Sequence, residues 1–452
     1  MLHPELSRFW ALSGEKIRLI ERDYDHSKGS PVFTIDGKYA TRGWTEWTQG
    51  FEFGSGILQF DATGEEWFLE FARNQTLAKM APHLSHFGVH DHGFNNVSTY
   101  GNLLRLYESG KCGDSQWEHA FYQLALKLSS AVQAKRWTQT ADGGFIHSFN
   151  GPHSLFVDTI RSCRSLALGH LLGHRFMDEG DREISLLGRL VKHARATAQY
   201  SIYYGENRDI YDLEPGRTTH EAVFNTVSGE FRCPATQQGY SAFSTWTRGL
   251  AWAMLGFSEQ LEFIREVSDE QLTPHGGRDV IVTAFLKAAR ATCDFFIKNT
   301  PKDGIPYWDT GAPGLSGLGC DYLNTNSDPF NEHEPVDSSA AAIGAQGLLR
   351  LGRYLGEESE DGRKYFQAGL TVARSLFNSP YLSDSETHQG LILHSIYHRP
   401  NGWDHIPMGS KIPRGESSMW GDYHARELAL YIGKLADGSD YSFFDCVPTT
   451  NE

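Results

Sequence analysis

The stretch STWTRGLAWAMLGFSEQL, residues 244–261, has the pattern of one helix with two different faces. At about 100° per residue, one face is apolar (Trp246, Leu250, Ala253, Phe257). The opposite face places Arg248 one turn from Trp252, where an ordinary surface helix would carry Lys, Glu or Gln. Because indoles stack on sugar rings and guanidinium groups hold carboxylates through a planar two-point contact, this face is typical of a binding site. The alternative is a structural cation–π contact between Arg248 and Trp252.

The same helical period recurs along the chain and predicts helices over 115–133, 161–174, 182–203, 281–298, 338–355, 364–377 and 423–435. Alternation typical of strands is short, at Phe33–Ile35 and 391–395, and no strand–helix alternation predicts a parallel sheet. A closed toroid of helix hairpins and an open solenoid both fit. Since no fixed repeat period is visible, and long loops rich in glycine and aromatics suit the mouth of a cavity, we expect an all-α toroid forming one domain over residues 1–452.

Composition limits the class of partner. The formal net charge of −15 argues against nucleic acid and anionic membranes, but allows an anionic sugar if basic groups concentrate in one pocket. No run approaches the roughly 18–20 apolar residues that span a bilayer. The first residues resemble no signal peptide, which favours a cytoplasmic protein, with a secreted or periplasmic mature form as the alternative. The oligomeric state is unknown at this stage.

Asp91 lies between two imidazoles in the segment HDHGFNN, residues 90–96. A metal site is one interpretation, but no second cluster of matching strength supplies further ligands, and the segment 331–334 has the composition of a solvated loop. We therefore predict no metal and no cofactor. Asp91 is better interpreted as an acid/base group or as an acceptor for sugar hydroxyls.

Asp158 follows three apolar residues in LFVDTIR, residues 155–161, where a helix begins. One interpretation is a helix N-cap, a position that favours Asp. The other is a carboxyl group in an apolar pocket, where desolvation disfavours ionisation and keeps a proton available. Asp337 also precedes a helix and is predicted to be a cap, and Asp309 is a third, lower-ranked acid.

Several motifs together resemble glycoside hydrolase family 88, the unsaturated glucuronyl hydrolases. They are WTQGF (47–51), HDHGF (90–94), VDTIRS (157–162), QGYSAFSTWTRGLAW (238–252), DSSAAAIGAQGLLRL (337–351) and ESSMWGDYHARELAL (416–430). The similarity runs from about residue 44 to about residue 435, and the segment 238–252 is the most specific because many positions agree in order and spacing. His220 lies where the family has a substrate-site histidine.

The resemblance implies an (α/α)6 barrel with its site in the central cavity. It implies that a lyase leaves a C4=C5 double bond on a terminal uronate, which the hydrolase then hydrates, with Asp158 as proton carrier and Asp91 positioning the sugar. By the same resemblance, His90, His220, Gln238, Arg248, Trp47 and Trp252 bind the substrate. Three departures stand out: Ala242 and Phe243 where acidic residues are usual, Glu52 and Phe53 where a Trp is common, and Arg161 and Arg164 where apolar or amide residues are expected.

Three alternative functions remain open at this stage. An inverting glycosidase on the same fold would attack C1 with two carboxylates about 6.5–9.5 Å apart. An unsaturated rhamnogalacturonyl hydrolase would share both chemistry and fold. The alternative that is not an enzyme is a silent carbohydrate-binding scaffold.

Overall fold

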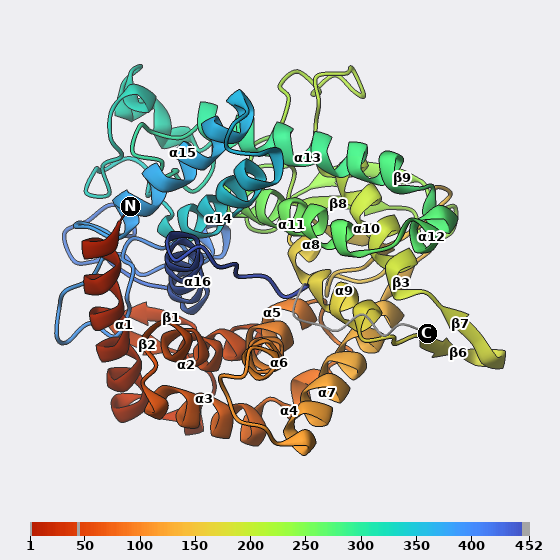
Figure 1. Ribbon diagram of the computed structural model, residues 1–452. Helices are drawn as coiled ribbons and strands as arrows, with labels where there is room; N and C mark the ends of the chain where they lie inside the picture. The colour runs from red at the N-terminus through yellow and green to blue at the C-terminus, as the bar shows by residue number, and fades with distance from the viewer. Residues whose placement is uncertain (1, 43–45, 445–452) are drawn as a thin grey trace.

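A computed structural model describes residues 2–42 and 46–444, in which helices form a ring (Figure 1). Its inner layer consists of α2 (Gln49–Thr63), α5 (His92–Asn96) continued by η3 (Val97–Gly101) and α6 (Asn102–Glu108), α8 (Thr159–Ser162) with α9 (Arg164–Leu171), α11 (Thr247–Glu266), α14 (Ser338–Leu355) and α16 (Met419–Ala436). Each inner segment packs against the next, and α16 packs against α2. The ring is therefore closed, and the predicted all-α (α/α)6 toroid is confirmed.

An outer layer of helices covers the ring. It consists of α1 (His3–Asp23), α3 (Glu66–Lys79), α7 (Gln116–Lys135), α10 (Leu186–Tyr200), α13 (Arg278–Lys298) and α15 (Glu360–Leu376), with the short helices α4 (Ala81–Leu84) and α12 (Asp269–Leu272). Helices α11, α14 and α16 are buried on nearly every side, whereas the outer helices keep one face in solvent. This difference explains why the second face of 244–261 lacks the Lys, Glu and Gln of a surface helix.

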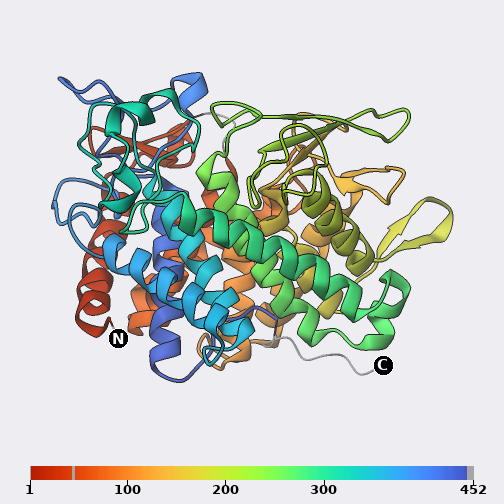
Figure 2. The same ribbon diagram turned by 90° about the horizontal axis from the view of Figure 1, so that it is seen from above.

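The strands are short, antiparallel and lie in the loops. They are β1 (Phe33–Ile35) with β2 (Lys38–Ala40), β3 (Trp137–Thr138) with β4 (Phe145–Ile146), β6 (Phe176–Asp178) with β7 (Arg182–Ile184), and a sheet of β5 (Ser154–Phe156), β8 (Glu221–Phe224) and β9 (Phe231–Ala235). The remaining short 3-10 helices are η1 (His26–Lys28), η2 (Glu46–Thr48), η4 (Glu179–Asp181), η5 (Thr273–His275), η6 (Pro313–Leu318), η7 (Tyr322–Asn324) and η8 (Arg399–Asn401). Seen from above, most of the long loops gather at one end of the ring (Figure 2).

Some predicted elements differ from the structure. The helix predicted over 338–355 matches α14, and the strand predicted at Phe33–Ile35 matches β1. The helix predicted over 182–203 instead begins with the strand β7, and the helix predicted over 161–174 is divided into α8 and α9. The segment 391–395 is not a strand, because its only pairing among the described residues is an isolated bridge between Ile392 and Leu382. In the helix predicted over 115–133, the apolar period places Trp117 and Leu124 on one face, and in α7 this face is turned outward, with 71% and 62% of these residues exposed.

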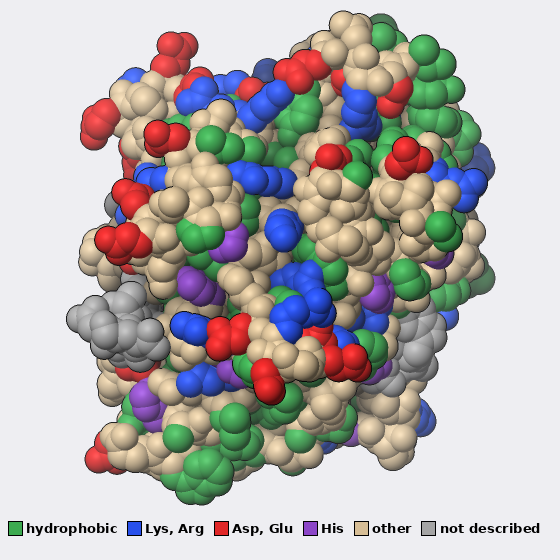
Figure 3. Space-filling model, turned by 90° about the vertical axis from the view of Figure 1, so that its right-hand side faces the viewer, with side chains coloured by type: hydrophobic (Ala, Val, Ile, Leu, Met, Phe, Trp, Pro, Cys, Tyr) green, Lys and Arg blue, Asp and Glu red, His purple; other side chains and the backbone are tan. Residues whose placement is uncertain are grey.

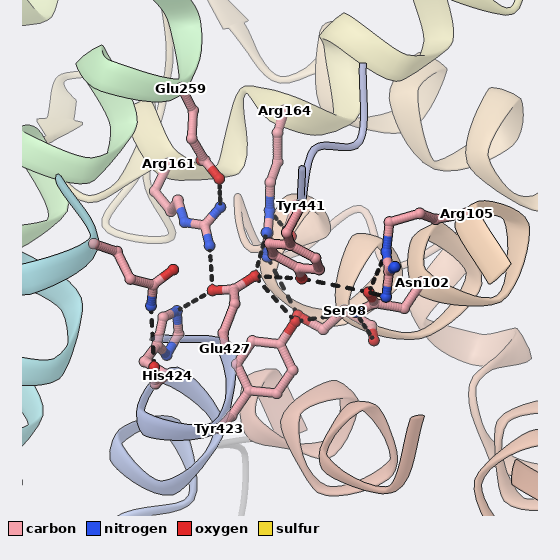
Figure 4. Close-up of polar contacts among 12 residues, drawn as sticks. Ser98, Asn102, Arg105, Arg161, Arg164, Glu259, Tyr423, His424, Glu427 and Tyr441 are labelled. Carbon is pink, nitrogen blue, oxygen red and sulfur yellow. Dashed lines mark hydrogen bonds and ion pairs between the residues drawn. The ribbon is translucent and has the colours of Figure 1, made fainter. Parts of the chain in front are cut away.

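A buried network of charges fills the axis of the toroid (Figure 4). Arg161 pairs with Glu259 and, through Nη2, lies 2.7 Å from Oε2 of Glu427. Arg164 Nη1 lies 3.5 Å from the other oxygen of Glu427, which also accepts a hydrogen bond from Tyr441 at 3.0 Å. The two arginines that depart from the family pattern therefore neutralise carboxylates contributed by α11 and α16.

The surface carries charges of both signs (Figure 3). On the face drawn in Figure 3, Lys and Arg side chains lie among Asp and Glu side chains without an extended region of one sign. Among the described helices, none is both long and apolar enough to cross a membrane. Five of the six cysteines are free thiols, and Cys446 lies outside the described residues.

Candidate active site

A cavity of about 260 Å³ opens where several inner helices begin. Its lining consists of Trp47, His90, Asp91, Phe94, Phe149, Asp158, Gln237, Gln238, Trp246, Arg248, Trp252, Tyr397, His398, Asn401 and Trp403. Trp47 precedes α2, Asp91 precedes α5, Asp158 precedes α8 and Trp246 precedes α11. Because the N-terminus of a helix carries partial positive charge, this end of the ring favours an anionic ligand despite the net negative charge of the chain.

His90 bridges the two predicted carboxylates. Its Nε2 lies 3.3 Å from Oδ1 of Asp158, within hydrogen-bonding contact, and 3.8 Å from Oδ1 of Asp91. All three side chains are buried. The structure therefore brings together two acids and a base from segments 68 residues apart.

A close approach of two helices positions this group. A Cβ on Gly93 would meet the carbonyl oxygen of Ser162 at 2.2 Å, so only glycine allows α5 to pack so closely against α8. At the contact, the Gly93 N–H donates to Ser162 Oγ at 2.8 Å, and Ser162 Oγ donates to the His90 carbonyl at 2.7 Å. Gln133 donates to the same carbonyl at 3.1 Å. The backbone of His90 is therefore fixed beside the start of α8.

Asp158 does not act as a cap. It occupies the N-cap position of α8, yet its carboxylate accepts no capping hydrogen bond and contacts His90 instead. Asp91 likewise precedes α5 without a side-chain cap bond. By contrast, Asp337 caps α14 as predicted and accepts from the N–H of Ser339 at 3.0 Å. Both candidate acids thus keep oxygens available for chemistry.

The two acids differ in electrostatic environment. Burial raises the pKa of Asp91, and the neighbouring charge of Asp158 adds to this effect, although His90 opposes it. Burial acts in the same direction on Asp158, but the hydrogen bond and charge of His90 outweigh it, so the pKa of Asp158 is lowered. Burial alone therefore does not keep a proton on Asp158 in the free protein. The pKa of His90 is raised because its two carboxylate neighbours outweigh its burial.

Arg248 is held by the protein on four sides. Its Nη1 pairs with Asp337 at 3.0 Å and donates to the Ile396 carbonyl, while its Nη2 donates to Gln238 Oε1 at 3.0 Å and to the Tyr397 carbonyl at 2.7 Å. The predicted two-point contact with a substrate carboxylate would require these bonds to break. Arg248 instead fixes the Gln238 amide, which leaves the Gln238 NH₂ group free to donate into the cavity.

The cation–π partner of Arg248 also differs from the prediction. The guanidinium lies over Trp246 at 4.6 Å and over Trp420 at 5.0 Å. Trp246 has extended backbone at the N-cap position, so its ring does not follow the helical pattern that placed it opposite Arg248. Trp252 instead packs against Phe94 and His424, with ring centroids 4.8 and 4.9 Å away.

The remaining predicted residues surround the cavity. Trp47 stacks on Trp420 at 5.2 Å and is partly exposed. His220 lies behind the lining, where its Nδ1 accepts the Gln237 N–H at 3.0 Å and its ring packs on Phe156 at 4.3 Å. Burial lowers the pKa of His220 to about 4, so the ring is neutral and its Nε2 carries the proton. Nε2 is buried without a hydrogen-bond partner.

Sequence reasoning missed one wall of the cavity. Tyr397, His398, Asn401 and Trp403 come from one loop, and the only local signal for them is the turn-forming Pro-Asn-Gly at 400–402 before Trp403. Phe149 was also missed.

Asp309, the third acid considered in the sequence analysis, has a structural role, since it accepts the N–H groups of Tyr240 and Gly311 at 2.8 Å each.

The departures from the family pattern lie outside the cavity lining. Glu52 is buried and pairs with His26 at 2.6 Å. Phe243 is partly exposed and stacks on Tyr211, with ring centroids 4.1 Å apart. The metal interpretation of the 90–92 segment finds no support in the position of His92, whose ring nitrogens contact Ser129 Oγ at 2.9 Å and the His86 carbonyl at 3.0 Å.

A closed helical toroid with two acids in an aromatic cavity agrees with the glycoside hydrolase class. No protein-family model matches the chain. It is 26% identical over 415 residues to the unsaturated glucuronyl hydrolase of Bacillus sp. (strain GL1), covering 89% of this chain and 90% of that protein. It is 25% identical over 434 residues to the unsaturated chondroitin disaccharide hydrolase of Streptococcus pneumoniae (strain ATCC BAA-255 / R6), covering 92% and 90%.

The fold has solved counterparts. A structure of an unsaturated glucuronyl hydrolase variant with dGlcA-Glc-Rha-Glc superposes with a TM-score of 0.72 at 21% identity, covering 100% of both chains. These similarities confirm the resemblance to glycoside hydrolase family 88. The chain is a glycoside hydrolase, similar over most of its length to unsaturated glucuronyl hydrolases.

Proposed function

We propose that the protein releases a 4-deoxy-hex-4-enuronic acid from the non-reducing end of lyase-generated oligosaccharides, and that the chain forms one catalytic domain. The observation that carries the proposal is the contact of Asp158 with His90, beside Asp91, in an aromatic cavity at the beginnings of inner helices. The bound dGlcA-Glc-Rha-Glc of the related structure supports this substrate class.

The reaction is a hydration. Protonated Asp158 delivers its proton to C4 of the vinyl ether, and the positive charge that develops at C5 is shared with the ring oxygen. Water then adds to C5 and returns a proton to Asp158, so that one group acts first as acid and then as base. The resulting hemiketal opens to a ketone at C5, which turns C1 into a hemiacetal. This hemiacetal collapses to an aldehyde and releases the aglycone sugar.

The surrounding side chains have supporting roles in the proposal. Asp91 accepts hydrogen bonds from ring hydroxyls, and His90 orients both acids. The Gln238 amide donates to the uronate, the Nε2–H of His220 donates to a water molecule behind the lining, and Arg248 supplies positive charge through Gln238. Trp47 and Trp252 offer aromatic surface to the sugar rings.

The rival is an inverting glycosidase that attacks C1. Since both Oδ1 atoms lie within 3.8 Å of one His90 nitrogen, they are at most about 7 Å apart, which reaches the lower end of the inverting range. The test incubates the enzyme with an unsaturated disaccharide and with its saturated analogue, and follows sugar release by chromatography. We expect release from the unsaturated compound alone; equal release from both would favour the rival. A silent carbohydrate-binding scaffold would release sugar from neither compound. The remaining alternative, an unsaturated rhamnogalacturonyl hydrolase, is tested with a panel of unsaturated rhamnogalacturonides.

A further inference from the structure

A second group of metal-ligating side chains lies outside the active-site lining. One donor atom each of Asp36, His405 and Glu416 all lie within 4.8 Å of one another. We propose that these three residues bind a divalent transition-metal ion of the Zn²⁺ or Mn²⁺ class. This site is separate from residues 90–92, where the sequence analysis considers a metal site and predicts none.

The hairpin turn positions Asp36. Asp36 and Gly37 form a two-residue connection between β1 and β2, and both have positive φ angles, 47° and 75°. Such a turn matches the twist of the flanking strands, and Asp-Gly is one of its preferred sequences. The Gln389 N–H donates to the Gly37 carbonyl at 2.7 Å. The turn is therefore anchored to the body of the protein, although the Asp36 side chain is 83% exposed.

Glu416 supplies a preorganised carboxylate behind the same turn. It is buried, and its Oε2 accepts the Gly37 N–H at 3.2 Å and the hydroxyl of Thr34. The backbone N–H of Ser417 in turn donates to the Thr34 hydroxyl at 2.8 Å. A carboxylate held by such bonds loses little further freedom when it coordinates a cation.

His405 completes the group. Its Nε2 lies 3.1 Å from Oδ1 of Asp36, yet it is buried without a hydrogen bond because the ring is not aligned with that oxygen. Because the three donor atoms are at most 4.8 Å apart, an ion can lie within about 2.8 Å of each of them. Small side-chain rotations would shorten these ion–ligand distances to the 2.0–2.2 Å typical of Zn²⁺. Two carboxylates and a neutral imidazole match a 2+ charge. The imidazole favours Zn²⁺ over Ca²⁺ and Mg²⁺, and the two carboxylates also suit Mn²⁺.

The site would tie the active-site loop to the hairpin. His405 follows Trp403, and Trp403 lines the catalytic cavity together with Asn401 from the same loop. Arg42, just after β2, already donates to the Trp403 carbonyl at 2.7 Å. A cation held by Asp36 and His405 adds a second tether between the same two segments, so we expect it to stabilise the loop at the wall of the cavity.

The test is calorimetric titration of the chelator-treated full chain with ZnCl₂, MnCl₂ and CaCl₂ in separate experiments. The variants are His405→Ala and Asp36→Asn, since Asn tolerates the left-handed conformation of the turn. His153→Ala, an exposed histidine elsewhere, is the matched control. Circular dichroism verifies that each variant is folded.

We expect one saturable equivalent of Zn²⁺ or Mn²⁺ in the wild type and in His153→Ala. Either site variant should weaken binding at least about ten-fold. The melting temperature should rise with the ion only where the site is intact. Equal binding in all variants, no saturable binding of Zn²⁺ or Mn²⁺, or a preference for Ca²⁺ would overturn the proposal.

Discussion

His90 Nε2 lies 3.3 Å from Oδ1 of Asp158, and this contact makes the two buried acids unequal. It lowers the pKa of Asp158, whereas burial leaves the pKa of Asp91 raised. In the proposed reaction, a uronate carboxylate enters the same cavity and adds a charge of the same sign as that of Asp158. This charge raises the pKa of Asp158 and favours the protonated form that delivers a proton to C4.

Asp158→Asn should abolish turnover. The amide is nearly isosteric but cannot donate and recover a proton, so we expect kcat to fall by about a thousand-fold or more, equivalent to about 4 kcal/mol of barrier. Substrate binding, measured by calorimetry, should persist. Asp384→Asn, at an exposed carboxylate on the surface, is the control and should keep wild-type kcat. Full activity in Asp158→Asn would show that another group carries the proton.

His90→Gln should change the pH dependence. Removing the imidazole removes the hydrogen bond and charge that hold the pKa of Asp158 down, so burial then raises it. The limb of the kcat/KM profile that reports Asp158 in the free enzyme should move to higher pH. His153→Gln should leave the profile in place. A His90→Gln profile that overlays the wild type would mean that His90 does not control Asp158.

Trp403→Ala should weaken substrate binding. Trp403 lines the cavity and is half-buried, packed against Tyr397 with ring centroids 5.2 Å apart. Losing its aromatic surface should raise KM about ten-fold, equivalent to roughly 1.4 kcal/mol, with a smaller effect on kcat. Trp117→Ala, on the outer helix α7, is the control. An unchanged KM in Trp403→Ala would place the sugar away from this loop.

Glu427→Gln should destabilise the fold. The charges of Arg161 and Arg164 outweigh the burial of Glu427 and lower its pKa. Replacing the Glu427 carboxylate with an amide leaves both buried arginines without this negative partner. We expect a loss of about 3–5 kcal/mol in the free energy of unfolding, measured by urea denaturation at pH 7. The exposed Glu266→Gln should change stability by less than about 0.5 kcal/mol.

The contacts of Glu427 with Arg161 and Arg164 also make the free energy of unfolding depend on pH. Because the folded-state pKa of Glu427 lies below its ordinary value of 4.5, its contribution is fully present above that value and is lost as pH falls through the folded-state pKa. The stability gap between wild type and Glu427→Gln should therefore narrow below about pH 4.5. A gap that stays constant down to pH 3 would contradict this explanation.

The fold could be predicted from the sequence where helices carry a clear apolar period. The range 338–355 coincides with α14 because small and apolar residues bury that helix on every side. The helix α2 was missed, since its Gly50, Gly54 and Gly56 weaken a helical signal. Those glycines serve packing: a Cβ on Gly50 would meet the Asn95 carbonyl at 2.3 Å. Interhelix contacts of this kind cannot be read from one segment alone.

The site was predictable only where its residues lie in local motifs. His90, Asp91, Asp158, Gln238 and Arg248 belong to such motifs, and the structure gathers them in one cavity. The partner of Arg248 is Asp337, which is 89 residues away and was interpreted only as a cap. On α7, the buried face carries Tyr122, Leu126 and Ser130, and Gly169 of α9 approaches Ser130 on that face. This long-range contact is not visible in the period of the segment itself.

The most direct test of the proposed chemistry is the ultraviolet absorbance of the C4=C5 double bond during turnover of an unsaturated disaccharide. Sugar release is followed in the same sample by chromatography. Hydration predicts that absorbance falls in step with release in the wild type and that Asp158→Asn leaves both unchanged. Sugar released while the absorbance persists would contradict the account, because the double bond would then survive cleavage at C1.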